Sequence, residues 1–186
     1  MSQPNVPSQD NVRVRRTRKL LREALVELVE ERGFDRITVG EITSRAMVSR
    51  AAFYRNYRDK YHLVEQIFDE AMAELRGTMG GDERPSGERW VGFFEHVGAY
   101  RRLYGALLGR RGSPWFADRM RAALAAMTTE HFADDDPRAL VPSVLSAMFV
   151  QTITWWLEHG QAMPPREIAG RSARLAAAVI AEADRA

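Results

Sequence analysis

The sequence of 186 residues contains no cysteine. Disulfide bonds and thiolate chemistry are therefore excluded, and the composition suits a reducing compartment, so we expect a cytoplasmic protein. No run of apolar residues approaches the roughly 20 that a membrane-spanning helix needs, so we expect no membrane partner. The first twelve residues, MSQPNVPSQDNV, lack the apolar segment of a signal peptide and are interpreted as a flexible arm.

Motifs for metal, cofactor or catalytic chemistry are also missing. The four histidines are scattered through the chain, so we expect no structural metal and no cofactor. There is no nucleophile elbow and no phosphate-binding glycine loop, and Met79-Gly80-Gly81 follows no predicted strand. No pattern points to a general acid–base pair on the helices. We therefore expect a protein that is not an enzyme.

Helical periodicity runs through nearly the whole chain. Because strand-like alternation is nowhere sustained, the predicted fold class is all-α with about nine helices. The first helix has an apolar face over residues 20–29 and is expected to end at Gly33. The stretch 76–88, rich in glycine, proline and charge, is the best linker candidate. Three later helices are predicted to open at a proline: Pro114, Pro137 and Pro165.

Charge is unevenly distributed along the chain, although the net charge is only +2. Residues 1–62 carry 13 basic and 8 acidic side chains, whereas residues 63–186 carry 14 and 17. A basic first third joined to a mildly acidic remainder suggests that one end of the molecule meets a polyanion.

Two short helices are predicted in the basic part, with a tight turn between them. The stretch Thr38–Glu41 has the form of a capping box and opens a helix to about Ala46, while Ser49 can cap a second helix to about Asn56. This arrangement is a helix-turn-helix, whose second helix enters the major groove of DNA. The residues expected to contact DNA are Thr38, Ser49, Arg50, Ala51, Ala52, Tyr54, Asn56, Tyr57 and Lys60.

The side chains at the start of the second helix suit base contacts. Arg50 can donate two hydrogen bonds to a guanine edge, and the small Ala51 and Ala52 allow the backbone to approach closely. Tyr54 and Asn56 can donate to phosphate oxygens.

The residues after that helix suit phosphate contacts. Tyr57 can donate to a phosphate, although it is equally compatible with a buried position. Asp59 is expected to cap the next helix, which puts Lys60 at a helix N-terminus, where an anion is favoured. Spacing and charge alone leave a merely solvated basic face as an open alternative.

The same residues also carry a resemblance. The first helix ends in ERGF, and ITVGEI, VSRAAFYRNY and DKYHLVE follow. On these stretches, the chain from about Arg15 to Glu70 resembles the N-terminal domain of the TetR/AcrR family of bacterial transcriptional regulators. It departs from the family pattern where Asn56-Tyr57 replaces a His-Phe pair, and where Met47 stands at a turn position that is often glycine. If that turn requires a positive φ, methionine there carries a steric cost.

The resemblance implies a DNA-binding regulator with a variable second domain that dimerises and often binds a small effector. We therefore divide the chain into a flexible arm (1–12), a helix-turn-helix domain (13–62) and a ligand-binding and dimerisation domain (63–186). The family's usual habit is a repressor that an effector releases from a pseudo-palindromic operator in double-stranded DNA. The segment FVQTITWWLEHGQAMPPREIAG more narrowly resembles a subgroup that includes regulators of dihydroxyacetone utilisation.

Two further surfaces are expected in the second domain. The last two helices, about 136–160 and 165–183, are the expected homodimer surface, formed by Met148, Trp156, Leu175 and Val179. A pocket for a small apolar or aromatic effector is expected to be lined by Phe93, His96, Tyr100, Trp115, Phe116, Met148 and Trp155. A Trp or Phe at helical spacing is more often a plain core residue, and His96 is also compatible with a hydrogen-bonded polar group that holds no ligand.

Two other classes of function stay open at this level. One is a helical module whose basic helix binds an acidic protein, and the other is an enzyme without a recognisable motif. Retention of specific DNA in a gel-shift experiment separates the regulator from both.

Overall fold

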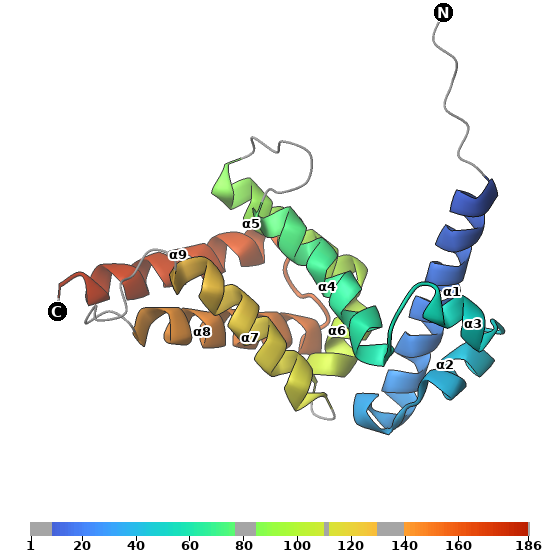
Figure 1. The fold of residues 1–186 in the computed structure, drawn as a ribbon. Coiled ribbons are helices and arrows are strands. Elements are labelled where there is room, and N and C mark those ends of the chain that lie inside the picture. The colour runs from blue at the N-terminus through green and yellow to red at the C-terminus, as the bar shows by residue number, and fades with distance from the viewer. Residues whose placement is uncertain (1–8, 77–84, 110–111, 130–139, 186) are drawn as a thin grey trace, which may run out of the picture. The chain divides into compact units, whose positions relative to one another are not determined.

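The computed structural model in Figure 1 describes residues 9–76, 85–109, 112–129 and 140–185. Over these ranges the chain forms nine α-helices, one short 3-10 helix and no strand, which confirms the predicted all-α class. The chain divides into two compact units, Met1–Ile67 and Phe68–Ala186.

The first unit holds three complete α-helices and the start of a fourth. In chain order its elements are α1 (Gln9–Arg32), η1 (Phe34–Arg36), α2 (Val39–Arg45), α3 (Arg50–Tyr54) and the first turns of α4 (Lys60–Arg76). Helix α1 starts at Gln9, so residues 9–12 are helical where a flexible arm was predicted. Residues 1–8 lie outside the described part of the chain.

Helix α1 ends where the sequence predicts. Gly33 has a φ of 78°, in the left-handed region that glycine adopts without steric cost, and its N–H donates to the Val29 carbonyl at 2.9 Å. The turn directs η1 back along α1, and Phe34 is only 1% exposed.

The second unit continues α4 and adds five helices. These are α5 (Ser86–Ala99), α6 (Arg101–Leu108), α7 (Pro114–Thr129), α8 (Leu140–Glu158) and α9 (Pro165–Ala183). Helix α7 packs against α8, and α5 packs against α9. Helices α5 and α6 meet at Tyr100. Pro114 and Pro165 open helices as predicted, whereas the opening at Pro137 and most of the linker candidate 76–88 lie outside the described residues.

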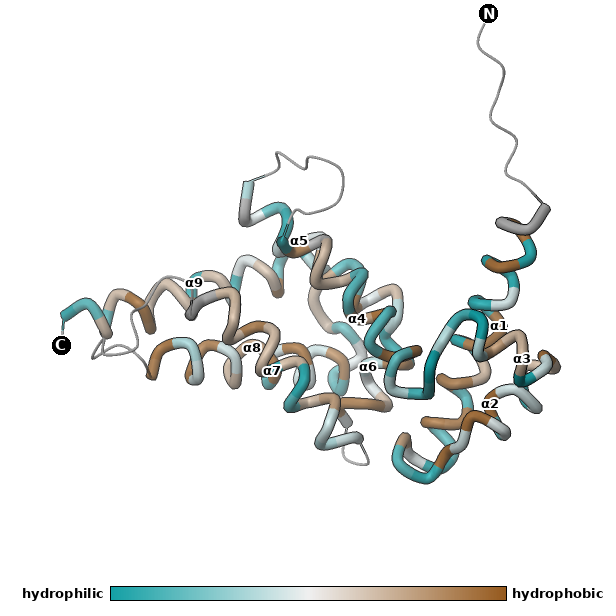
Figure 2. Tube along the Cα trace, in the orientation of Figure 1, coloured by the Kyte–Doolittle hydropathy of each residue, from teal (hydrophilic) through white to brown (hydrophobic). Residues whose placement is uncertain are grey.

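Helix α8 is more apolar than the sequence analysis allowed. Within the described part of the chain it alone is long and apolar enough to cross a membrane by length and composition, and Figure 2 shows apolar residues along its length. Seven of its residues are nevertheless buried in the second unit. Among them is Trp156, which is 0% exposed and whose indole N–H donates to the Met163 carbonyl at 2.8 Å. Much of the apolar character of α8 therefore belongs to the protein core.

Candidate nucleic-acid interface

The predicted capping box is present at the start of α2. The Thr38 hydroxyl accepts the backbone N–H of Glu41 at 3.3 Å, and the Glu41 carboxylate accepts both the N–H and the hydroxyl of Thr38 at 2.9 Å. These hydrogen bonds favour the ionised carboxylate, so they lower the pKa of Glu41 below its ordinary value of 4.5. The first helix of the helix-turn-helix therefore begins at a fixed point.

An ion-pair cluster holds α2 against α1. The Arg45 guanidinium donates to Glu27 at 3.1 Å and to Glu31 at 2.8 Å. The pKa of Glu31 is lowered, chiefly by this hydrogen bond from Arg45. Two carboxylates on neighbouring turns of α1 thus face one cation near the end of α2, which orients the helix that precedes the turn.

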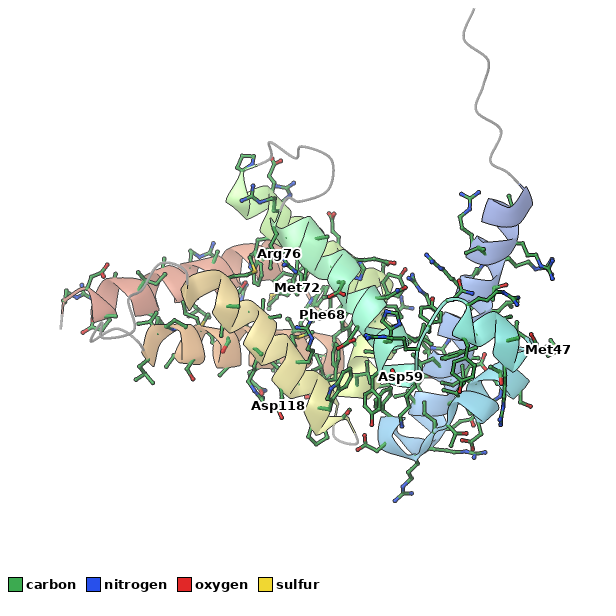
Figure 3. All side chains as sticks on the ribbon, viewed as in Figure 1. Met47, Asp59, Phe68, Met72, Arg76 and Asp118 are labelled. Carbon is green, nitrogen blue, oxygen red and sulfur yellow. The ribbon has the colours of Figure 1, made fainter. Side chains whose placement is uncertain are left out.

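The turn between α2 and α3 does require a positive φ at Met47. Met47 has a φ of 53°, and the following N–H, that of Val48, donates back to the Thr43 carbonyl at 3.0 Å. The Met47 side chain is 90% exposed and points away from the helices (Figure 3). A non-glycine residue therefore occupies the left-handed region without gaining any burial.

Helix α3 is capped at its start and packs against the core through one face, so its opposite face is exposed to solvent. The Ser49 hydroxyl accepts the N–H of Ala52 at 3.1 Å, which confirms the predicted cap. Phe53 is 0% exposed and fixes the helix in the core. Four of the residues expected to contact DNA are exposed on α3 or at its cap: Ser49, Arg50, Ala51 and Tyr54. Thr38, at the cap of α2, is exposed as well.

The structure places Tyr57 and Asn56 differently from the prediction. Tyr57 is 1% exposed, with its ring 5.6 Å from the Phe53 ring, so its proposed phosphate contact is corrected to a core position. The Asn56 amide donates to the Ala52 carbonyl at 2.8 Å and accepts from Arg18 at 3.2 Å. Asn56 therefore joins the end of α3 to α1, and it is half-buried.

Arg50 is exposed but lies over α2. A Cβ placed on Gly40 would stand 2.6 Å from the Arg50 Nη2 atom, so the guanidinium occupies space that only glycine leaves open. The long side chain has several rotatable bonds, so its position over α2 is one of several staggered rotamers. Gly40 thus provides the resting place of the residue that is expected to read a base.

Lys60 has partners other than the phosphate that was expected. Its ammonium donates to three backbone carbonyls, those of Phe34 at 2.9 Å, Asp35 at 3.1 Å and Ile37 at 2.9 Å. An ammonium has three N–H donors, so all of them are used. The nitrogen also lies 4.7 Å from the centre of the Phe34 ring, and burial lowers the pKa of the group. In this structure Lys60 fastens the start of α4 to η1.

The predicted cap of α4 is present beside Lys60. The Asp59 carboxylate accepts the N–H of His62 at 2.7 Å. The position of Lys60 at a helix N-terminus is therefore confirmed, while its contacts are those of a structural residue.

Several exposed basic residues were missed by the sequence analysis. Arg55 follows α3 directly, and Arg13, Arg15 and Arg16 lie on the first turns of α1. All four are exposed. The signal was available, because the excess of basic residues over 1–62 is concentrated partly in the run RVRRTRK.

The first unit also matches a known family. Residues 21–67 match the model described as "Bacterial regulatory proteins, tetR family". This segment is a TetR-family N-terminal domain. The match covers the second half of α1, η1, α2, the turn, α3 and the first part of α4, so it includes the helix-turn-helix described above.

Over most of its length the chain has low sequence identity to a known protein. An uncharacterized HTH-type transcriptional regulator of Bacillus subtilis (strain 168), YxbF, is 25% identical over 165 residues, which are 84% of this chain and 43% of that protein. The chain therefore spans less than half the length of this relative.

Solved structures extend the likeness in fold beyond the TetR-family domain. A TetR transcriptional regulator from Streptococcus agalactiae 2603V is 22% identical with a TM-score of 0.62, over 90% of this chain and 97% of that chain. The dihydroxyacetone kinase operon activator DhaS is 15% identical with a TM-score of 0.59, over 87% and 93%.

The second unit distributes the predicted ligand residues between its core and its surface. Phe93 and Phe116 are 0% and 1% exposed, and each packs on aromatic neighbours: Phe93 stacks on Trp90 at 5.2 Å, and Phe116 meets Phe68 edge-on at 5.6 Å. These two residues are core residues in the structure. His96, Tyr100 and Trp115 are half-buried.

Two grooves lie on different flanks of α9. The apolar groove, of about 420 Å³, is lined by Leu75, Gly87, Arg89, Trp90, Leu124, Met127, Phe149, Ala173, Ala176, Ala177 and Ile180. The α8–α9 groove, of about 400 Å³, is lined by Met148, Gln151, Thr152, Trp155, Met163, Ile168, Arg171, Ser172 and Leu175. None of the seven predicted ligand residues lines the apolar groove, and two of them, Met148 and Trp155, line the other.

Of the predicted dimer residues, Met148 and Leu175 line the α8–α9 groove and Val179 is half-buried. Trp156 is buried completely, which corrects its assignment to a subunit interface. Its neighbour Trp155 is 39% exposed. Adjacent residues on a helix project about 100° apart, so one tryptophan of the pair faces the core and the other the surface.

Proposed function

We propose that this protein is a cytoplasmic, sequence-specific DNA-binding transcriptional regulator. The observation that carries the proposal is the outer face of α3, where a capped helix presents Arg50, Ala51 and Tyr54 while Phe53 anchors it from behind. A helix that offers small residues, an arginine fork and a tyrosine hydroxyl together suits a major groove. The match of residues 21–67 to the tetR family supports the same function.

Each side chain on this face is assigned a role. Arg50 reads a guanine, Ala51 and Ala52 allow close approach, and Ser49, Tyr54 and Thr38 hold phosphates. We add Arg55, which is exposed beside Tyr54, as a further phosphate contact. Tyr57 is left out of the interface because it is buried.

The protein acts as a homodimer through α8 and α9. Apolar side chains recur on one exposed face of α8 at Leu140 (69% exposed), Val144 (40%) and Trp155 (39%), and Leu175 of α9 is 55% exposed. Spacings of four and eleven residues bring the α8 side chains to one stripe. A second copy that packs its own stripe against this one buries both, which a two-fold axis permits.

The operator is then pseudo-palindromic. Two recognition helices related by a two-fold axis bind half-sites about one helical turn apart, roughly 34–36 Å. A small-molecule effector that favours the conformation unfit for DNA releases the regulator. Repression is usual in the family that the first unit resembles, so the proposed role is that of a repressor. The protein DhaS, which is similar in fold, is described as an operon activator. Relatedness to regulators of dihydroxyacetone utilisation is also part of the proposal. This relatedness does not identify the effector.

A gel-shift experiment tests the function. The purified protein is mixed with the DNA that flanks its own gene and with scrambled DNA of equal length, at two salt concentrations. We expect retention of the flanking DNA at a salt concentration where the scrambled DNA runs free. Equal retention of both would show DNA binding without sequence specificity and would contradict the proposal. Retention of neither, together with capture of an acidic protein partner, would point to a helical interaction module.

A further inference from the structure

Three arginines converge on one recess of the second unit. Arg76 at the end of α4, Arg89 on α5 and Arg119 on α7 line a cavity of about 430 Å³, which we call the basic recess. The rest of its lining is Leu75, Ala122, Ala123, Ala126 and Met127. No acidic residue is part of this lining within the described chain. Figure 3 shows Arg76 one turn beyond Met72 on α4.

The arginines are held by their surroundings. The Arg76 Nε donates to the Met72 carbonyl at 3.3 Å, which orients the guanidinium at the helix end. Arg119 lies 3.6 Å from the Asp69 carboxylate, with both side chains more than a third exposed, and its guanidinium lies 5.7 Å from the Phe68 ring.

The basic recess lies beside the apolar groove. Leu75, Arg89 and Met127 line both cavities, so the two adjoin each other. The groove is almost wholly apolar beyond Arg89, with Trp90, Leu124 and Phe149 providing flat and branched surfaces. Its volume of about 420 Å³ lies within the range of about 300–1,000 Å³ that is usual for small-molecule sites.

From this juxtaposition we propose that the second unit binds an amphipathic anion. An oxyanion head, carboxylate or phosphate ester, sits between Arg76, Arg89 and Arg119, and an unbranched or aromatic apolar tail lies along the groove beside Trp90. Guanidinium groups bind carboxylate and phosphate oxygens through paired N–H donors, and the groove removes the tail from water. The assignment rests on the proposed function, since it gives the chemical class of the effector.

The site is tested by isothermal titration without DNA, so that a failure of DNA binding and a failure of this site are observed separately. The probes are decanoate, decyl phosphate, decan-1-ol and inorganic phosphate, each below its aggregation concentration. We expect at least one of the two decyl anions to bind at least tenfold more tightly than decanol, and inorganic phosphate not to bind. Which of the anions binds more tightly identifies the head group.

The length of the tail gives a second readout. Each methylene that leaves water contributes about 0.8 kcal/mol, so octanoate should bind about fifteenfold more weakly than decanoate if the carboxylate is the preferred head. The same comparison is made between octyl and decyl phosphate if the phosphate is preferred. An affinity that does not change with tail length would show that the groove takes no part.

Matched arginine variants locate the head group. Arg89→Gln should weaken binding about tenfold, and Arg76→Gln, which is more exposed, about threefold. Arg121→Gln is the control, because Arg121 lies on α7 like Arg119, is paired with Asp118 and lines neither cavity. Two other variants keep the test valid if Arg89→Gln fails to fold. Arg76→Gln removes one charge from the basic recess, and Ala177→Phe fills the groove without altering charge.

The proposal is overturned by any of three results. These are decanol binding as tightly as both anions, no binding of any decyl compound, or an equal affinity for Arg76→Gln, Arg121→Gln and the unaltered protein. Binding that is weakened by Arg76→Gln and Ala177→Phe but not by Arg121→Gln supports it.

Discussion

Lys60→Met is the substitution whose outcome the structure determines most fully. Methionine keeps the apolar stem of the side chain near the Phe34 ring and removes the ammonium that donates to three carbonyls. Hydrogen bonds to charged groups contribute about 1.5–3 kcal/mol each. Three of them would sum to far more than the true loss, because Lys60 is only half-buried and water can reach the carbonyls.

A net loss of about 2–3 kcal/mol is therefore expected. The Phe34 carbonyl keeps the N–H of Ile37, at 3.4 Å, as a second partner, which limits the effect. In a chain of this length such a loss lowers the thermal midpoint by about 5–10 °C. The assay is thermal unfolding followed by circular dichroism.

Lys19→Met is the matched control, since the chain has only these two lysines. The Lys19 side chain is 77% exposed, and its nitrogen lies 3.8 Å from Glu23. A surface pair of this kind contributes little, so this variant should unfold within about 0.5 kcal/mol of the unaltered protein. Equal midpoints for the two variants would refute the structural role of Lys60.

DNA binding by the folded Lys60 variant gives an independent answer. If the ammonium is committed to the carbonyls, the slope of log K against log salt concentration should not change. A slope smaller by about 1 per protomer would show that Lys60 also neutralises a phosphate, as the sequence analysis predicted.

Three further predictions concern the turn, the cap and the dimer. Met47→Gly removes a left-handed strain of about 1–2 kcal/mol, while the added chain entropy stabilises the unfolded state by about 0.4–1 kcal/mol. Urea unfolding should therefore show a free energy of unfolding higher by about 0.5 kcal/mol. A lower free energy of unfolding would contradict the strain at Met47. Glu41 has a lowered pKa, so its contribution to stability is present above pH 4.5 and disappears as pH falls through the folded-state value; the gap in thermal midpoint between Glu41→Gln and the unaltered protein should be larger at pH 7 than at pH 3. Leu175→Glu buries a charge in the proposed dimer, so light scattering at micromolar concentration should give the monomer mass, whereas an unchanged dimer would place the interface elsewhere.

The features that the sequence predicted correctly are those encoded within a few residues. The capping box at Thr38, the caps at Ser49 and Asp59 and the end of α1 at Gly33 each depend on groups three or four positions apart. Because such partners lie only a few residues apart in the sequence, the pattern of residue types is enough to identify them.

The features that the sequence missed depend on contacts between distant segments. Lys60 meets carbonyls 23 to 26 positions earlier, and no local pattern announces a backbone acceptor. Tyr57 and Trp156 combine an apolar ring with a polar group, so residue type alone fits either an interface or the core, and only packing shows that both are buried. The arginines of the basic recess come from three helices, so their convergence follows only from the fold.

The most direct test of the account is the affinity of the unaltered protein and of Arg50→Ala for its operator and for a scrambled duplex. A bidentate contact to guanine contributes about 1–3 kcal/mol of discrimination. Arg50→Ala should therefore bind the operator about 5- to 150-fold more weakly and lose its preference at one position of each half-site, while its affinity for scrambled DNA falls much less. Arg121→Ala, which removes the same charge from the second unit, should match the unaltered protein on both duplexes. An equal loss for Arg50→Ala on operator and scrambled DNA would contradict base reading by α3.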